Sequence, residues 1–232
     1  MKISIIIPLY NEEKTILALL EKIRNIREFN KQVIIVDDFS TDDSLKLVQN
    51  YNKLENLQIL NHRKNLGKGA AIRTAQKYIE GDIVIIQDAD LEYNPDDYKN
   101  LLIPIINREY KIVYGSRVLN KNRYGSLNFT SVYRIFFNHI LTILSNILNN
   151  QNLTDAHTCY KIFDAKVFNK INLQENRFGF CPEVTTKISK LNYKIKEVPI
   201  SYNGREYSDG KKIGIFDGFD AIKCLIKYKY FA

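Results

Sequence analysis

Cysteine is scarce in this chain of 232 residues, and its three cysteines lie far apart in the sequence. Cys159, Cys181 and Cys224 are odd in number and too scattered to indicate a disulfide framework, a zinc finger or a redox pair. Disulfides are rare where glutathione and thioredoxin keep thiols reduced. We therefore interpret the three cysteines as reduced thiols of a cytosolic protein.

Long hydrophobic runs are missing as well. The apolar segment 3–8 is too short for a signal peptide and soon meets polar residues, so we expect it to be a buried strand. The longest apolar region, 132–148, is interrupted by an arginine, a histidine and two asparagines. Because a transmembrane helix needs about 20 predominantly apolar residues, we do not expect this region to span a bilayer.

Tracts rich in arginine or lysine are absent, and so is the aromatic signature of RNA-binding sheets, which makes nucleic acid the least favoured partner. Lys and Arg nevertheless outnumber Asp and Glu by 34 to 26, giving a net charge of +8. A positive charge favours anionic partners such as nucleoside diphosphates or anionic lipid surfaces. The length and the 45% of hydrophobic residues suit one large globular domain.

What the chain does contain is an alternation of apolar runs and amphipathic segments. Apolar runs without polar alternation predict strands buried on both faces, which we expect at 3–8, 32–36, 57–60, 83–87 and 111–115. Helical spacing of apolar residues predicts helices at 12–27, 44–50 and 70–78. Strands alternating with helices indicate an α/β protein with a parallel sheet covered on both faces.

Polar motifs follow each of the expected strands. They are Pro8-Leu9-Tyr10-Asn11-Glu12, Asp37-Asp38, Gly67-Lys68-Gly69, Asp88-Ala89-Asp90 and Gly115-Ser116-Arg117. In open parallel sheets, ligands bind in the crevice beyond the carboxyl ends of the strands. The five motifs are therefore expected to line one rim of the sheet.

The acids after the fourth strand have the chemistry of a metal site. Asp88 and Asp90 are one residue apart at the strand end, and Glu92 follows two residues later. Such oxygen ligands can converge on Mg²⁺ or Mn²⁺, which neutralises the charge of a diphosphate leaving group. The alternative is a pair of acids that only starts the turn at 94–97.

The segment 131–149 has a helical pattern with opposite apolar and polar stripes. The apolar stripe contains Phe136, Ile140, Ile143 and Ile147 beside Phe137, Leu141, Leu144 and Leu148. The polar stripe contains Arg134, Asn138, Thr142, Ser145 and Asn149. We expect a core helix that buries the apolar stripe, because few positive charges decorate the polar side. A helix at a membrane surface is the alternative, and the basic, aromatic stretch 223–231 favours it.

The order of the motifs resembles that of the family 2 glycosyltransferases with the GT-A fold, and most of all their dolichyl- and polyprenyl-phosphate sugar synthases. Segments 154–161, 177–183 and 210–213 add to the resemblance, which runs from residue 3 to about residue 228. Phe39 departs from the family pattern, where glycine is usual, and Glu92 departs from the glutamine of lipid-phosphate mannosyl synthases. The membrane-spanning C-terminal helices of some relatives are also missing.

The resemblance implies a Rossmann-like, mostly parallel sheet with helices on both faces and a smaller acceptor-side C-terminal part. It implies one domain over 1–232, with a nucleotide-sugar half at 1–118 and an acceptor-side half at 119–232. The residues it implies for nucleotide-sugar binding are Pro8, Tyr10, Glu12, Val36, Asp38, Lys68, Asp88, Ala89 and Asp90. Those it implies for the metal are Asp88, Asp90 and Glu92, and those for catalysis are Asp88, Asp90, Arg117, Asp155, Arg205 and Lys212.

Several of these side chains also have a plainer structural interpretation. One of Asp37 and Asp38 could cap a helix rather than hold a nucleoside. Lys68 could reach a phosphate or only cover the surface, and Arg117 could pair with a nearby acid instead of a phosphate. The Gly67-Lys68-Gly69 motif resembles part of a dinucleotide fingerprint, but it follows the third strand and lacks the last glycine, which disfavours hydride transfer.

The acceptor decides the roles of the remaining candidates. A sugar hydroxyl needs a general base, for which Asp155 and Glu183 are the candidates, with His157 beside them. A lipid phosphate is mostly ionised at neutral pH, so it needs cations and no base. Arg205 and Lys212 either close over phosphate as a mobile loop or form only a basic hairpin.

We therefore expect a metal-dependent, inverting transfer of a hexose from a UDP- or GDP-sugar to a polyprenyl phosphate, with peripheral contact at the cytoplasmic face of the membrane. The first alternative is a transferase of the same fold that extends a cell-surface glycan on a sugar hydroxyl. A noncatalytic binder of sugar nucleotides or lipid surfaces and a sugar-phosphate nucleotidyltransferase are further alternatives. The chain does not indicate an oligomeric state.

Overall fold

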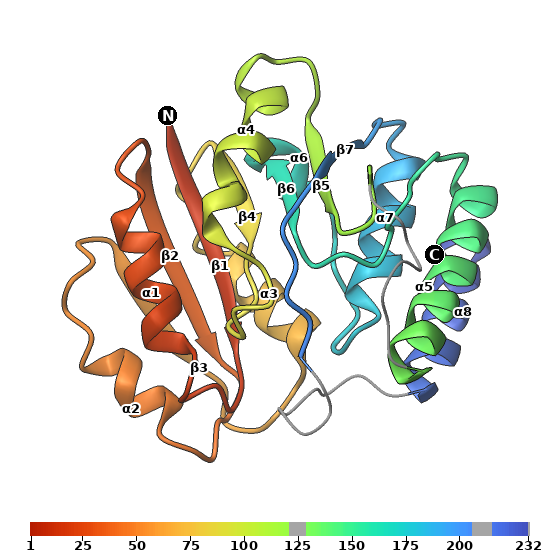
Figure 1. Cartoon of the computed structure of the whole chain (residues 1–232). Helices are drawn as coiled ribbons and strands as arrows, with labels where there is room; N and C mark the ends of the chain where they lie inside the picture. Colours follow the sequence, from red (N-terminus) through yellow and green to blue (C-terminus); the bar gives the residue numbers. More distant parts are fainter. Residues whose placement is uncertain (121–128, 206–214, 232) are drawn as a thin grey trace.

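A mixed sheet of seven strands forms the centre of the computed structural model, which describes residues 1–120, 129–205 and 215–231 (Figure 1). The strands lie in the order β3-β2-β1-β4-β6-β5-β7. The predicted α/β architecture, with helices on both faces of a mostly parallel sheet, is confirmed.

The strands predicted from the apolar runs lie within two residues of their expected positions. They are β1 (Lys2–Leu9), β2 (Asn30–Asp37), β3 (Leu57–Asn61), β4 (Ile83–Ile86) and β5 (Ile112–Ser116). β1 pairs in parallel with β2 and β4, and β2 pairs in parallel with β3. Ile5, Ile6 and Ile7 are all fully buried, and alternate residues enter the cores on opposite faces, which explains the unbroken apolar run.

Helices cover both faces of the sheet. One face packs against α1 (Ile16–Asn25), α2 (Ser44–Gln49) and α4 (Tyr98–Ile106), which follows the short 3₁₀ helix η1 (Pro95–Asp97). The other face packs against α3 (Lys68–Gln76), α6 (Ala165–Phe168) and α7 (Phe180–Lys190). The first helix begins later than predicted, because Asn11 has a positive φ of 50° and holds the chain in a turn.

The sheet contains two further strands that the apolar runs did not predict. β6 (Lys161–Asp164) lies between β4 and β5 and is antiparallel to both, and β7 (Lys196–Pro199) pairs in parallel with β5. Both have only four residues, and β6 carries the fully buried Lys161. β6 is therefore the antiparallel member of this mostly parallel sheet.

Two long helices, α5 (Phe129–Asn149) and α8 (Ile215–Tyr230), lie side by side at one end of the molecule (Figure 1). The expectation that α5 buries its apolar stripe is wrong for most of the stripe, because Ile143 and Ile147 are exposed while Thr142 and Ser145 are buried; Leu141 is the buried exception. Periodicity shows that two stripes oppose each other, but the tertiary fold decides which one faces inward. No helix within the described ranges is long and apolar enough to cross a membrane.

Candidate active site

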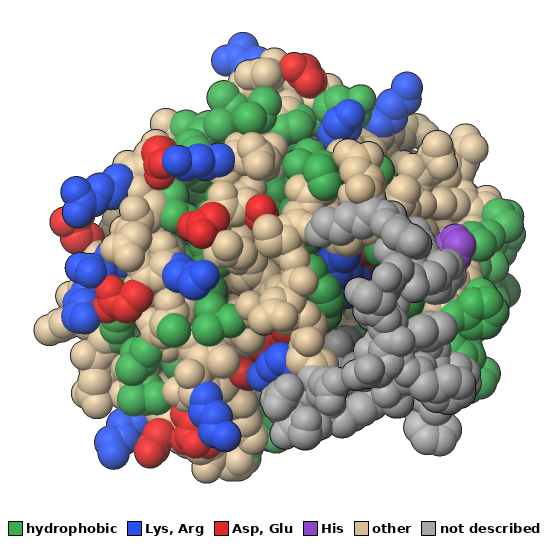
Figure 2. All heavy atoms as spheres, viewed as in Figure 1, with side chains coloured by type: hydrophobic (Ala, Val, Ile, Leu, Met, Phe, Trp, Pro, Cys, Tyr) green, Lys and Arg blue, Asp and Glu red, His purple; other side chains and the backbone are tan. Residues whose placement is uncertain are grey.

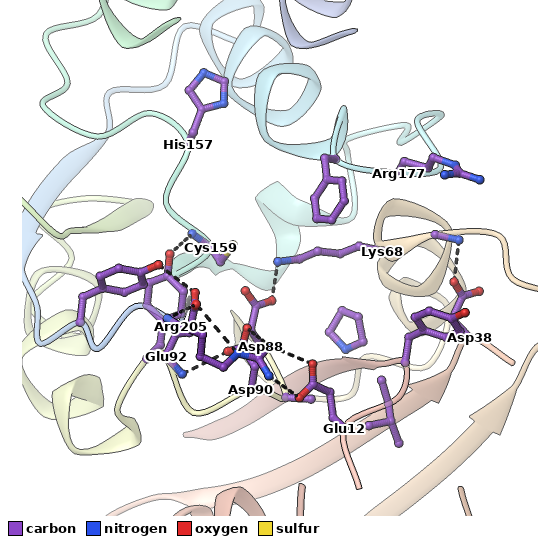
Figure 3. Close-up of a pocket in the computed structure, with 18 of the residues that line it drawn as sticks. Glu12, Asp38, Lys68, Asp88, Asp90, Glu92, His157, Cys159, Arg177 and Arg205 are labelled. Carbon is purple, nitrogen blue, oxygen red and sulfur yellow. Dashed lines mark hydrogen bonds and ion pairs between the residues drawn. The ribbon is translucent and has the colours of Figure 1, made fainter. Parts of the chain in front are cut away.

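A pocket of about 310 Å³ opens beyond the carboxyl ends of β1, β2 and β4 (Figure 3). The predicted site residues that line it are Pro8, Tyr10, Glu12, Asp38, Lys68, Asp88, Ala89, Asp90, Glu92, Arg117 and Arg205. Val36, Asp155 and Glu183 lie outside this lining, and Lys212 lies outside the described residues. Parallel strands thus bring motifs from distant parts of the chain to one rim.

Asp88 carries a lysine partner. The Lys68 ammonium, from the first turn of α3, donates a hydrogen bond to Oδ1 of Asp88. Burial alone would raise the pKa of Asp88, but the charge of Lys68 together with hydrogen bonds from Cys159 and Lys68 outweighs burial and lowers it. Burial alone would likewise lower the pKa of Lys68, and Asp88 raises it well above its usual range. The interpretation that Lys68 only covers the surface is therefore wrong, because Lys68 forms an ion pair with Asp88 inside the pocket.

Arg205 lies among the other acids of the pocket (Figure 3). Its guanidinium donates to both oxygens of Glu12 at 3.0 Å and to Oδ2 of Asp90 at 3.0 Å. Its backbone N–H donates to Oε1 of Glu92 at 2.7 Å. A residue predicted to belong to a closing loop is thus in direct contact with the candidate metal ligands.

Asp88 and Asp90 fit a divalent cation that is shared between the protein and a bound phosphate. Mg²⁺ is usually bound through one or two carboxylates together with substrate phosphates rather than by an all-protein cage. Burial, and then the charges of Asp88 and Glu92, raise the pKa of Asp90 to about 7, although Arg205 lowers it. This corner therefore holds negative charge that a further cation would stabilise.

Glu92 is bound differently from the two aspartates. Its Oε2 accepts a hydrogen bond from the Tyr202 hydroxyl at 2.8 Å, and its Oε1 accepts the N–H of Arg205. Among the described residues, no group of three or more His, Cys, Asp or Glu side chains is arranged to hold a metal ion by itself. Glu92 acts here as an anchor for the 202–205 segment, and its predicted role as third ligand stays untested.

Arg117 is held in the pocket wall by Asp155. The guanidinium donates from Nε to Oδ2 at 2.7 Å and from Nη2 to Oδ1 at 2.8 Å, while its other flank lies over the Tyr202 ring. Asn138 also donates to Oδ1 of Asp155 at 3.2 Å. Burial would raise the pKa of Asp155, but Arg117 holds it well below the usual range. The predicted ion pair of Arg117 exists, and it is buried rather than on the surface.

Glu183 is buried in the first turn of α7 and serves the loop before that helix. Its two oxygens accept the backbone N–H groups of Gln174 at 2.7 Å and Glu175 at 2.9 Å, and Lys187 donates to Oε1 at 2.7 Å. These contacts are those of a structural carboxylate.

Asp38 organises the glycine loop instead of capping a helix. Its oxygens accept the N–H groups of Leu66 at 2.8 Å and Gly67 at 2.6 Å, and Oδ1 lies 2.7 Å from Nδ1 of His62. Asp37 accepts the Ser40 N–H at 3.1 Å. Neither acid caps α2, so the capping interpretation is wrong for both.

The pocket also contains residues that the sequence did not single out as site residues. They are Leu9, Asn65, Gly67, Tyr93, Cys159, Arg177, Phe178 and Tyr202, and His157, named above as a neighbour of the candidate bases, lines the pocket as well. Arg177 and Phe178 belong to one of the motifs behind the family resemblance, which was the available signal. Tyr202 forms an isolated β-bridge with Tyr93, and a contact across more than a hundred residues leaves no mark in the local sequence.

Two cysteines that are distant in the sequence meet behind the pocket. The thiols of Cys159 and Cys181 share a hydrogen bond, which lowers the pKa of Cys181 and raises that of Cys159. The two thiols are thus neighbours in the fold although they lie 22 positions apart in the sequence. Both are free thiols, as is Cys224.

Known proteins resemble the chain over most of its length. A dolichyl-phosphate beta-glucosyltransferase of Trichomonas vaginalis is 29% identical over 251 residues, covering 99% of this chain and 73% of that protein. A UDP-N-acetylglucosamine–dolichyl-phosphate N-acetylglucosaminyltransferase of Methanococcus voltae is 29% identical over 247 residues, covering 98% of this chain and 96% of that protein.

The fold has solved counterparts as well. Glucosyl-3-phosphoglycerate synthase from Mycobacterium tuberculosis, in complex with Mn²⁺, UDP and phosphoglyceric acid, matches with a TM-score of 0.73 at 16% identity. The match covers 100% of this chain and 79% of that chain and shows a shared GT-A fold. The family model for glycosyl transferase family 2 matches residues 4–171, which is most of the chain. This protein therefore belongs to glycosyltransferase family 2.

Proposed function

We propose that this glycosyltransferase moves a hexose from a UDP- or GDP-sugar to a polyprenyl phosphate in a metal-dependent, inverting reaction. The observation that carries the proposal is the pocket corner in which Asp88 and Asp90 lie beside Lys68 and Arg205. It combines oxygen ligands for a hard cation with cationic side chains for phosphate. Two whole-chain relatives are named as dolichyl-phosphate transferases, which supports a lipid phosphate acceptor.

The donor is proposed to bind in the half formed by residues 1–118. Pro8, Tyr10 and Asp38 line the pocket where β1 and β2 end, a suitable place for a nucleoside. Val36 is fully buried and pairs with Pro8 in the sheet. We therefore propose that it supports the nucleoside site through its backbone rather than through its side chain. Lys68 and Ala89 line the route from there to the aspartates.

Asp88 and Asp90 would hold Mg²⁺ or Mn²⁺, which when bound neutralises the charge that develops on the departing diphosphate. Lys68 and Arg117 bring positive charge to the same pocket, each fixed by an acid. Arg205 is proposed to exchange its contacts with Glu12 and Asp90 for contacts with phosphate. Lys212 is proposed to help from the same C-terminal segment.

The proposed acceptor makes proton removal unnecessary. An ionised phosphate oxygen attacks the anomeric carbon opposite the diphosphate, the new C–O bond forms as the old one breaks, and the nucleoside diphosphate leaves. A sugar hydroxyl would instead need a base such as Asp155 or Glu183. Both carboxylates are engaged in hydrogen bonds, and the lowered pKa of Asp155 makes it a weak base. These contacts favour the phosphate acceptor, with Asp155 positioning Arg117.

The test incubates the purified protein with labelled UDP- and GDP-sugars, a polyprenyl phosphate in detergent, and Mn²⁺ or Mg²⁺. We expect label to enter the organic phase with one donor, and Asp90→Asn to reduce transfer about a hundredfold or more, because charge stabilisation of the leaving group is lost. Asp43→Asn, at an exposed position near α2, is the matched control and should keep full turnover. Transfer only to a water-soluble sugar would contradict the proposal and support the glycan-extending alternative.

A further inference from the structure

Helix α5 buries its polar stripe and exposes most of its apolar stripe, which is the reverse of the usual amphipathic helix. Its polar residues Thr142, Ser145 and Asn149 are each only 1% exposed, whereas Ile143 is 47% and Ile147 is 73% exposed. Soluble monomeric proteins normally place the apolar stripe of a helix against the core. The reversed orientation therefore needs a physical reason.

The buried polar stripe is fixed by specific hydrogen bonds. Asn149 donates to the Thr186 hydroxyl of α7 at 3.2 Å, and Thr142 accepts the Ala156 N–H at 3.3 Å. Asn146 donates to the carbonyl of Leu153 at 2.8 Å and accepts its N–H at 2.9 Å. Rotating the helix to bury its isoleucines would break these bonds inside the protein. The outward position of the apolar stripe is therefore built into the fold.

Helix α8 extends the apolar surface beside α5. Phe219, Ile226 and Tyr230 are exposed and share one stripe with Lys223, at the spacing i, i+4, i+7 and i+11. Phe231 follows and is 81% exposed. Hydrophobic side chains accordingly lie along the right edge of the molecule, over α5 (Figure 2; compare Figure 1). We call the exposed apolar residues of α5 and α8 the α5–α8 face.

We propose that the α5–α8 face docks on the surface of an anionic lipid bilayer. The inference rests on the proposed function in one respect, namely that the acceptor is a lipid. A bilayer surface accepts a helix whose apolar side chains enter the acyl boundary while lysines remain at the headgroups. A bilayer surface as the binding partner explains why the isoleucines of α5 face outward.

Charge favours lipid over a protein partner. Residues 135–149 of α5 contain no Asp, Glu, Lys or Arg, and α8 contains three lysines against the two acids Asp217 and Asp220. Interfaces between proteins that form and dissociate carry a polar rim, whereas residues 135–149 of α5 surround their exposed phenylalanines and isoleucines with no charged side chain of their own. Lysines next to such a stripe complement anionic headgroups.

The same helix reaches the catalytic pocket through its polar side. Asn138 of α5 donates to Asp155, and Asp155 holds Arg117 in the pocket wall. The α5–α8 face therefore lies on the helix that helps position a phosphate-binding candidate. A membrane on this face would present lipid headgroups on the acceptor side of the molecule.

The test is flotation of the full chain with vesicles of phosphatidylcholine, with and without phosphatidylglycerol, and without donor or acceptor. We expect binding to the anionic vesicles and a loss of about tenfold or more in the double variant Ile143→Gln/Ile147→Gln, because two exposed apolar side chains leave the lipid. Ile103→Gln/Ile106→Gln removes two isoleucines of α4 that are 51% and 42% exposed, and this variant should bind like the unaltered protein. Lys223→Gln should reduce the preference for anionic vesicles about fivefold.

Equal flotation of the Ile143→Gln/Ile147→Gln variant and the unaltered protein would overturn the proposal. So would light scattering that shows a dimer which this variant dissociates, because the face would then bind a second copy. Transfer to polyprenyl phosphate without vesicle binding would overturn the docking inference and leave the proposed function. Vesicle binding without such transfer would overturn the proposed function and leave the docking inference. Transfer to a short-chain, water-soluble prenyl phosphate should persist in the variant, which shows that it is folded.

Discussion

Arg205 is central to the charge balance of the pocket. Its guanidinium holds Glu12 and Asp90, and its backbone N–H holds Glu92, so it links three acids. A divalent cation at Asp90 would compete with Arg205 for the same carboxylate oxygen. Binding of a cation at Asp90 would therefore be coupled to release of the 202–205 segment from the acids.

Replacing Arg205 by glutamine should therefore have opposite effects on metal binding and on turnover. We expect Arg205→Gln to bind Mn²⁺ about tenfold more tightly in the absence of nucleotide, because about 1.4 kcal/mol of competition disappears. Turnover should fall, since the variant lacks the guanidinium for phosphate. Isothermal titration with Mn²⁺ measures the first effect, and Arg205→Lys, which keeps the charge, should shift the affinity less. Weaker Mn²⁺ binding by Arg205→Gln would contradict the exchange.

The acids of the pocket could be predicted from the chain because each directly follows a strand, and strand ends are local features. Their partners could not, since Arg205 lies 115 residues from Asp90 and nothing local in the sequence specifies that contact. The role of Asp155 was also ambiguous, because an acid that serves as a base and one that anchors an arginine look alike in sequence. Only the bidentate contact with Arg117 separates the two.

At the scale of elements, the loop before α3 is locked to the segment before α7. The Ala70 N–H donates to the carbonyl of Asn176 at 3.0 Å, and Gly67 has a φ of 98°, which suits glycine. A Cβ on Gly69 would lie 2.3 Å from the carbonyl oxygen of Glu175. These glycines permit close approach of two backbones, a function that the dinucleotide-like pattern did not indicate.

Gly69→Ala should consequently destabilise the protein. Alanine is favoured over glycine in a helix by about 1 kcal/mol, but the clash with backbone should cost about 1–3 kcal/mol and outweigh that gain. Gly218→Ala in α8 is the matched control, because its Cβ would meet nothing within 4 Å, and it should stabilise by about 0.4–1 kcal/mol. Urea unfolding measures both. A Gly69→Ala protein as stable as the parent would show that the two loops separate easily.

For α5, the sequence predicted the helix and its two stripes but not their orientation. The polar stripe faces inward because Thr142 accepts the N–H of Ala156 and Asn149, which also donates to Ser145 within the helix, donates to Thr186 of α7. The partners outside the helix are set by the tertiary fold. Helical periodicity is an intrinsic property of the segment. The direction in which the helix faces depends on its neighbours.

At the scale of the whole molecule, the pocket joins both halves of the chain. Glu12 and Asp90 come from the first half, while Arg117 is held by Asp155 and Glu92 by Tyr202 from the second. The first five strands were predictable because each coincides with an apolar run, which is largely buried in β1, β2, β4 and β5 and half-buried in β3 at the sheet edge. β6 was not, because a strand of four residues with a buried lysine is an antiparallel insertion that only the assembled sheet explains.

Because donor and cation would bind in a pocket whose lining comes from both halves, their binding should stabilise the entire chain against thermal unfolding. At about 100 times the dissociation constant, a ligand adds about 2.7 kcal/mol, which for a domain of this size raises Tm by about 5–10 °C. We expect UDP or GDP together with Mn²⁺ to raise Tm by more than the two separate shifts combined, since the diphosphate and the aspartates share one cation. Asp90→Asn should lose the Mn²⁺-dependent part and keep the shift due to nucleotide alone, whereas Asp43→Asn should behave like the parent. Differential scanning calorimetry measures these shifts, and strictly additive shifts in the unaltered protein would show that nucleotide and cation bind at separate places.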